Sequence, residues 1–191
     1  NVATLEGFND LADWGADSIR CNIGGGSICT TRIQTGHGVP GLETIFECAK
    51  SDRDAKIIAD GGIKTSGDIV KALAAGADFV MLGSLLAGTD ESPGETFTGN
   101  CGELRKVYRG MASSTAQQDW RGKVASQEGV SSSVPYKGPV STMINELVTG
   151  IRSGLSYSGA RTIKELQLKA KWLKQTNAGI IESSDHVRLI K

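Results

Sequence analysis

Residues 18–32 read SIRCNIGGGSICTTR: an apolar run, 18–23, is followed by three glycines and then by Cys29. The run is typical of a buried strand, and the glycines let the backbone turn tightly and approach a ligand closely. Donors and positive charge around a sulfur favour the nucleophilic thiolate. Such neighbours here are Ser27, Thr30, Thr31 and Arg32. Structural cysteines usually lie within an element as small hydrophobic residues, so this cysteine loop (residues 24–32) indicates a reactive thiol, with an incidental cysteine in a connector as the alternative.

Strand–loop–helix units recur around the cysteine loop. The apolar spacing predicts strands at 18–23, 56–60 and 79–82 and helices at 5–14, 42–49 and 66–75. Each strand is followed by a glycine-containing loop that carries Cys29, Asp60 or Ser84. Polar loops at the carboxyl ends of parallel strands form the functional face of a (β/α)₈ barrel. The sequence therefore predicts an α/β fold, a TIM (β/α)₈ barrel.

The number of strands is too small for a closed barrel. The chain supplies three strands, whereas the barrel needs eight and typically about 250 residues. An open half-sheet would expose unpaired edges and an apolar interior. We therefore expect the chain to be about the C-terminal half of a barrel, completed by another chain or segment that supplies the N-terminal half. Alone, it is expected to aggregate or to be unfolded.

The second half of the chain is less regular. Residues 90–102 are polar and rich in glycine and predict a loop. Residues 112–133 lack apolar periodicity and are rich in Ser, Gln and Gly, which suits a mobile flap. Apolar spacing predicts helices around 140–151 and 163–170 and a short strand at 187–190, within the tail at residues 179–191.

Composition excludes several classes of protein. The formal net charge is zero with both signs interspersed, so no basic patch indicates nucleic acid binding. No apolar run approaches the length of a membrane span, and the N-terminus lacks a signal-peptide pattern. The four cysteines have neither paired nor metal-ligand spacing, which predicts reduced thiols and a cytoplasmic protein.

Several separate stretches, in order along nearly the whole chain, resemble the IMP dehydrogenase/GMP reductase family. They are the cysteine loop with Thr35-Gly36-His37-Gly38-Val39-Pro40, Ile58-Ala59-Asp60-Gly61-Gly62-Ile63, Val80-Met81-Leu82-Gly83-Ser84, Tyr108-Arg109-Gly110-Met111, Glu128-Gly129 and Val134-Pro135-Tyr136-Lys137-Gly138. The cysteine loop with Tyr-Arg-Gly-Met downstream is highly specific, whereas Asp-Gly-Gly alone occurs in many phosphate-binding barrels. The resemblance implies that residues 1–191 form the C-terminal part of the catalytic barrel, strands 6–8 with flap and C-terminal helices.

The resemblance also implies roles for individual residues. Cys29 would attack C2 of a purine nucleotide monophosphate and form a covalent adduct, while Thr31 and the flap acid Glu128 would handle protons. The nucleotide would be held by Ser27, Asp60, Gly62, Gly83, Ser84, Tyr108, Gly110 and Met111. Asp60 can accept both ribose hydroxyls, and glycines at strand ends leave backbone N–H groups free for phosphate.

The family's cofactors and assembly are implied in the same way. NADPH or NAD would exchange hydride with the nucleotide. A potassium site would use backbone carbonyls of Gly24, Gly26 and Cys29, completed by a neighbouring subunit's tail. The tail residues concerned are Glu182, Ser183 and Ser184. A homo-oligomer, tetramer or octamer, is therefore expected.

The sequence has features of both enzymes of this family, GMP reductase and IMP dehydrogenase. Dehydrogenases hydrolyse the covalent intermediate with an Arg-Tyr pair on a long flap, and no such dipeptide lies between Met111 and Glu128. The short flap favours GMP reductase, whereas residues 83–89 and the tail look more like IMP dehydrogenase. The usual Gly-Pro-Gly of the loop is Gly-Gly-Gly here, and His37 replaces its usual valine and is interpreted as a polar loop residue.

Two readings outside purine oxidoreduction also stay open. An FMN-dependent barrel oxidoreductase shares the Asp-Gly-Gly and Gly-Ser phosphate loops but would not need Cys29. A non-catalytic half-barrel would only assemble with a partner.

Overall fold

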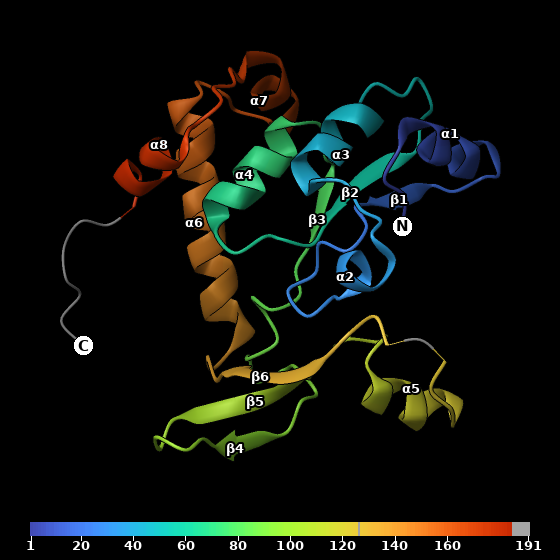
Figure 1. Ribbon diagram of the computed structural model, residues 1–191. Helices are drawn as coiled ribbons and strands as arrows, with labels where there is room; N and C mark the ends of the chain where they lie inside the picture. Colours follow the sequence, from blue (N-terminus) through green and yellow to red (C-terminus); the bar gives the residue numbers. More distant parts are fainter. Residues whose placement is uncertain (126, 185–191) are drawn as a thin grey trace.

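The computed structural model describes residues 1–125 and 127–184, which form a larger α/β part and a smaller sheet with one helix (Figure 1). The α/β part contains the parallel strands β1 (Ser18–Cys21), β2 (Lys56–Asp60) and β3 (Phe79–Met81) and the helices α1 (Leu5–Asp13), α2 (Thr31–Thr35), α3 (Gly41–Cys48), α4 (Ser66–Ala74), α6 (Val140–Tyr157), α7 (Ile163–Lys169) and α8 (Asn177–Glu182). The smaller part contains the antiparallel strands β4 (Thr96–Thr98), β5 (Leu104–Arg109) and β6 (Ser131–Pro135) with α5 (Ser114–Arg121).

The parallel sheet has the order β1-β2-β3, as the strand–loop–helix pattern predicts. Its register pairs Cys21 with Ala59 and Asp60 with Met81, so the carboxyl ends of the strands meet at one edge. The cysteine loop and the loops after β2 and β3 all leave from that edge. β1 ends at Cys21, short of the expected residue 23, because Asn22 has a φ of 129° that extended backbone does not allow.

Two apolar clusters hold the helices against the sheet. The first joins α1, α3 and the strands and contains Phe8, Ile19, Cys21, Ile45 and Cys48, all at most 3% exposed. The second joins α4, α6 and α7 through Ile69, Leu73, Leu147, Ala160 and Leu166. Cys21 and Cys48 are thus core thiols.

Among the described residues, the parallel sheet has no further strand at either edge. Val2 forms a parallel bridge with Cys21 on the side of β1 away from β2, and β3 is the other edge. Phe79 on β3 is 58% exposed, which is unusual for a strand of a central parallel sheet. These features are those of a barrel segment with neighbouring strands still to be added.

The smaller part corrects the expectation of an unstructured connection. Residues 90–102 contain β4, which pairs Thr96 with Lys106 of β5, and the flap contains α5 and part of β6. α5 begins at a Ser113 cap, whose Oγ accepts from the Ala116 N–H, and ends at Gly122 in the left-handed conformation. Its polar sequence has good caps but little apolar periodicity. The expected strand at 187–190 lies outside the described residues.

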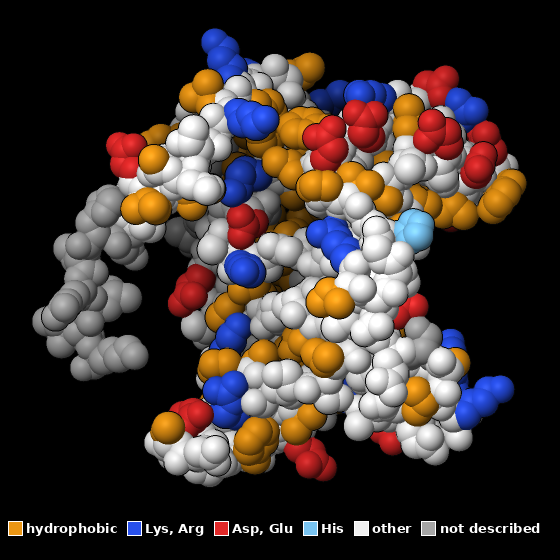
Figure 2. Space-filling model, viewed as in Figure 1, with side chains coloured by type: hydrophobic (Ala, Val, Ile, Leu, Met, Phe, Trp, Pro, Cys, Tyr) orange, Lys and Arg blue, Asp and Glu red, His pale blue; other side chains and the backbone are white. Residues whose placement is uncertain are grey.

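The surface agrees with the balanced composition. Figure 2 shows basic, acidic and apolar side chains interspersed over the face in view. Within residues 1–125 and 127–184, no helix is both long and apolar enough to cross a bilayer.

Lys106 on β5 holds the segment that connects β3 to β4, and its replacement by methionine is expected to lower the free energy of unfolding by about 1–3 kcal/mol. The side chain is 4% exposed, and Nζ donates to the backbone carbonyls of Thr89 (2.8 Å), Asp90 and Ser92. Methionine leaves these carbonyls without their donor. Urea unfolding would measure the loss, and exposed Lys50→Met is the control with little effect; equal stability of both variants would contradict the prediction.

Candidate active site at the cysteine loop

The cysteine loop folds back on itself at the edge of the sheet. The Cys29 N–H donates to the Gly26 carbonyl at 3.1 Å, which closes a tight turn before α2 begins at Thr31. The Cys29 Sγ donates to Thr31 Oγ1 at 3.1 Å, and the cysteine is only partly buried. The thiol therefore lies at the surface of a pocket with a hydroxyl beside it, rather than in the core.

The flap lies directly against this loop. The Thr30 N–H donates to the Glu128 carbonyl at 2.9 Å, and the Val130 N–H donates to the Ile28 carbonyl at 3.0 Å. An antiparallel bridge pairs Cys29 with Gly129. These backbone bonds bring Glu128 to Cys29 across about a hundred residues of sequence, as the sequence interpretation requires.

A pocket of about 410 Å³ opens at this point. Its lining includes Cys29, Thr31, Glu128 and Asp60 together with Gly24 and Gly26 of the loop. It also includes Asn1, Arg20, Asn22, Ile23 and Gly25, which were not singled out in the sequence. The predicted catalytic residues and the predicted ribose acid thus share one pocket.

Asp60 is held by two side chains that sequence reasoning missed. Arg20 donates to Asp60 Oδ2 from Nη2 at 2.7 Å and from Nε at 3.1 Å, and Asn1 Nδ2 donates to the same oxygen at 2.7 Å. Among the described residues, Oδ1 of Asp60 receives no such donor and remains available to a ligand. The alternation of side chains along β1 could have indicated Arg20, because Ile19 and Cys21 face the helices and Arg20 therefore faces the opposite side of the sheet.

Other residues expected to hold the nucleotide are grouped in part. The hydroxyls of Ser27 and Tyr108 lie 3.4 Å apart, and a Cβ added at Gly83 would lie 3.0 Å from the Tyr108 hydroxyl. A Cβ added at Gly110 would lie 3.5 Å from Ile28 of the cysteine loop. Met111 is 70% exposed.

Gly62 and Ser84 follow the other two strands. Gly62 has a φ of 78°, a left-handed conformation that favours glycine, and it lies near the carbonyl of Gly25. The carbonyl of Ser84 accepts from Lys137 Nζ at 3.3 Å.

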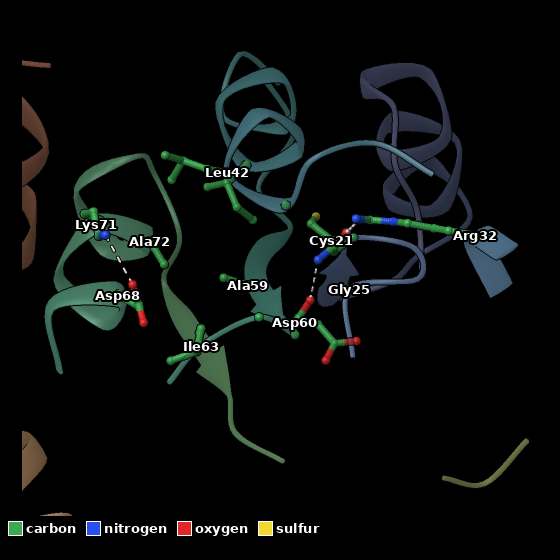
Figure 3. A pocket seen from close by; sticks show the side chains of 15 residues that line it. Cys21, Gly25, Arg32, Leu42, Ala59, Asp60, Ile63, Asp68, Lys71 and Ala72 are labelled. Atoms are coloured by element: carbon green, nitrogen blue, oxygen red, sulfur yellow. Dashed lines mark hydrogen bonds and ion pairs between the residues drawn. The ribbon is translucent and has the colours of Figure 1, made fainter. Parts of the chain in front are cut away.

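A second cavity, of about 280 Å³, lies behind the cysteine loop between α3 and α4. Figure 3 shows Arg32 and Gly25 on one side of it and Lys71 and Ala72 on the other. Arg32, expected to lend positive charge to the sulfur, lines this cavity instead. Its guanidinium donates to the carbonyls of Ile23 and Val39.

Only one of the nearby thiols suits a nucleophile. A hydrogen bond to Cys48 and burial raise the pKa of Cys21 well above its usual range, so that thiol stays neutral. Cys101 is exposed and lies between β4 and β5, away from the pocket lining. Cys29 alone combines exposure with the pocket.

The expected potassium ligands do not meet within the chain. Gly24 and Gly26 share the loop with Cys29, whereas Glu182 ends α8, which lies beyond α6 and apart from α2 (Figure 1). Among the described residues, no three His, Cys, Asp or Glu side chains gather as a metal site. His37 is an exposed loop residue whose Nδ1 lies 2.7 Å from the Thr35 carbonyl.

Comparison with known proteins agrees with this geometry. The profile described as "IMP dehydrogenase / GMP reductase domain" matches residues 1–186. The chain belongs to this family. Membership confirms the family and the barrel fold inferred from the motifs, and it removes the reason to consider an FMN-dependent barrel.

Relatives within the IMP dehydrogenase/GMP reductase family carry both names. Inosine-5′-monophosphate dehydrogenase from Aquifex aeolicus is 53% identical over 97% of this chain and 40% of its own length. GMP reductase from Leishmania major is 45% identical over 97% of this chain and 40% of its own length. The chain therefore spans about two-fifths of the relatives it matches.

A solved structure of the family superposes closely. It is a cysteine-to-alanine variant of GMP reductase from Trypanosoma brucei in complex with guanosine 5′-monophosphate. The TM-score is 0.94 at 44% identity, over 99% of this chain and 40% of that one. The α/β part is thus a segment of a TIM barrel.

Proposed function

We propose that the chain forms the C-terminal part of a purine nucleotide oxidoreductase that acts at C2 through Cys29, and that the enzyme is a GMP reductase. The observation that carries the proposal is the single pocket in which Cys29, Thr31 and Glu128 face Asp60. The named relatives and the GMP-bound structural neighbour support the substrate class.

The pocket would bind the nucleotide at two ends. Asp60 Oδ1 would accept from the ribose hydroxyls, while Arg20 and Asn1 hold the carboxylate in its orientation through Oδ2. Hydroxyls of Ser27 and Tyr108 and backbone N–H groups at Gly62, Gly83 and Ser84 would hold the phosphate. Gly110 and Met111 would complete the nucleotide site.

Chemistry would begin at the sulfur. Cys29 loses its proton and forms a bond between Sγ and C2 of GMP, and the 2-amino group leaves as ammonia once protonated. Thr31 Oγ1, 3.1 Å from Sγ, and the Glu128 carboxylate would move these protons. The bond between Sγ and C2 then breaks, and the sulfur recovers its electron pair as C2 is reduced to give IMP.

A nicotinamide cofactor, NADPH or NADH, would supply the hydride to C2 when bound. The described residues fit its reacting end, because the pocket of about 410 Å³ extends from Cys29 to Thr31 and Glu128. The described lining adds no uncommitted lysine or arginine for its phosphates, since Arg20 is engaged by Asp60. The rest of the cofactor would be held by other parts of the barrel.

The choice of GMP reductase over IMP dehydrogenase depends on the sequence of the flap. Hydrolysis of the adduct needs a base that activates water, and no Arg-Tyr pair lies between Met111 and Glu128. A reductase does not need that step, which supports GMP reductase. IMP dehydrogenase, which would turn IMP, NAD and water into XMP and NADH, is the second candidate, favoured by residues 83–89, the tail and several dehydrogenase relatives.

The remaining features concern assembly. A separate chain or segment would add the N-terminal half of the barrel beside Val2 and β3. Backbone carbonyls of Gly24, Gly26 and Cys29 would bind potassium with the Glu182-Ser183-Ser184 tail of a neighbouring subunit in a tetramer or octamer. The distance of α8 from the loop in Figure 1 suits a tail that acts on another copy.

The direction can be tested on the complete barrel that contains this chain. GMP with NADPH is expected to give loss of nicotinamide absorbance and one ammonia per turnover. IMP with NAD is expected to give little NADH, because water is poorly activated. Steady NADH formation with release of XMP would instead make the protein a dehydrogenase, and no turnover in either direction would favour a non-catalytic half-barrel.

A further inference from the structure

Asn22, the residue directly after β1, has a backbone conformation that its side chain disfavours. Its φ is 129°, and it is the one non-glycine residue with positive φ in the described part of the chain. Such a conformation costs free energy for any residue with a Cβ and persists only where surrounding contacts impose it. Asn22 is also 4% exposed, so its amide is buried beneath the cysteine loop.

All four polar groups of Asn22 have partners, which come from three segments of the chain. The N–H donates to the Val2 carbonyl and the backbone carbonyl accepts from Asn1 Nδ2, both at 2.8 Å. The side-chain Nδ2 donates to the Asp60 carbonyl at 2.8 Å, and Oδ1 accepts from Arg32 Nη2 at 3.0 Å. One residue thus joins the chain start, β1, the end of β2 and α2.

The side chains of Asn22 and Arg32 occupy space that is available only because their neighbours in and near the loop are glycines. A Cβ added at Gly25 would lie 2.0 Å from Asn22 Nδ2, and one at Gly41 would lie 2.8 Å from it. A Cβ at Gly24 or Gly38 would lie 2.6 Å from the Arg32 side chain. The buried amide and the guanidinium therefore fill the interior of the loop.

The guanidinium of Arg32 forms hydrogen bonds to both ends of the loop. Its Nε donates to the Ile23 carbonyl at 3.0 Å and its Nη2 to the Val39 carbonyl at 2.6 Å. Because Nη2 also donates to Asn22, the start and end of the segment from Ile23 to Val39 are fixed to one point. Cys29 lies within that segment.

We propose that Asn22 is a positioning residue that fixes the cysteine loop, through Arg32 and the Asp60 carbonyl, in the shape that presents Cys29 to the pocket. The proposal rests on the proposed function only for the role of Cys29 as nucleophile. The strained backbone of Asn22 is retained because its amide holds the loop. Gly25 is required because the amide leaves no room for a side chain there.

A double-mutant cycle on the complete barrel tests this assignment, with Asn22→Gly, Gly25→Ala and the combined variant. Asn22→Gly relieves the backbone, so Tm is expected to be kept or raised, while kcat falls at least tenfold with a smaller change in KM. Gly25→Ala is expected to lower kcat at least tenfold in the parent and less than twofold in the Asn22→Gly background. Gly67→Ala is the matched control, since its added Cβ meets nothing closer than 3.6 Å.

A second readout does not depend on turnover. The rate at which iodoacetamide alkylates Cys29, relative to exposed Cys101, is expected to change at least threefold in Asn22→Gly and in Gly25→Ala, and the second substitution to add nothing to the first. If this pattern appears in a protein that turns over neither GMP nor IMP, the positioning role stands and the proposed function fails. The positioning role is overturned if Gly25→Ala lowers kcat by the same factor in the parent and in the Asn22→Gly variant. It is also overturned if Asn22→Gly lowers Tm but leaves kcat unchanged.

Discussion

Replacement of Cys29 by alanine is expected to lower kcat for GMP reduction by about 10⁴-fold or more, because the covalent path through C2 is then closed. Nucleotide binding should persist, since Asp60, Ser27 and Tyr108 are untouched and alanine occupies less of the pocket. Loss of nicotinamide absorbance under single-turnover conditions measures the first effect. Equilibrium binding of GMP measures the second, with a change of less than about tenfold expected.

The control for this prediction is Cys101→Ala, which removes an exposed thiol outside the pocket and should leave kcat unchanged. Mass spectrometry adds a direct test, because the parent enzyme trapped during turnover should carry a nucleotide on the peptide that contains Cys29. A Cys29→Ala enzyme that still turns over at more than about a hundredth of the parent rate would show that the sulfur is not the nucleophile.

The α/β part could be predicted from sequence because its signals are local. The strand 56–60 is an apolar run between polar residues, and α4 has the capping box that Thr65 and Asp68 form with each other's backbone. Burial on both faces of a parallel sheet produces such continuous runs. The boundaries were less exact, since β1 ends at Cys21 rather than at residue 23, where the positive φ of Asn22 leaves extended backbone.

The smaller part could not be predicted because its strands depend on distant partners. β4 is three residues long and fully exposed, and it exists through antiparallel pairing of Thr96 and Thr98 with β5. β6 reads Ser-Ser-Ser-Val-Pro, which carries no alternation of apolar residues. β6 is a strand because it pairs with β5 along its whole length, from Ser131 opposite Arg109 to Pro135 opposite Arg105.

Some residues of the candidate site could likewise be predicted from the sequence, and others could not. Cys29 could be chosen from its place in a glycine-rich loop after a strand, and the roles of Thr31 and Asp60 from the resemblance to the family. The residues that hold them in place could not be predicted. Arg20 looked like any charged residue of a strand, but it binds Asp60. Arg32 was expected to face the sulfur, but it binds the Val39 carbonyl. Orientation of a long side chain depends on which carbonyls the folded loop presents, and that is a tertiary property.

Substitution of Asp60 by asparagine is expected to raise KM for the nucleotide by about 100-fold, with a much smaller change in kcat. The carboxylate binds Arg20 and Asn1 through Oδ2 and would accept from the ribose through Oδ1. An amide loses the charge-assisted part of both interactions, which is worth about 3 kcal/mol in total. Steady-state kinetics with varied GMP at saturating nicotinamide would separate the two constants.

Asp54→Asn is the matched control, since Asp54 pairs with Lys56 just before the same strand, is fully exposed and is far from the pocket lining. It should leave both constants unchanged. A GMP analogue that lacks the ribose hydroxyls adds a second comparison, because the Asp60→Asn enzyme should no longer discriminate against it. If the variant still discriminates as the parent does, then Asp60 serves to hold Arg20, and the ribose is recognised elsewhere in the barrel.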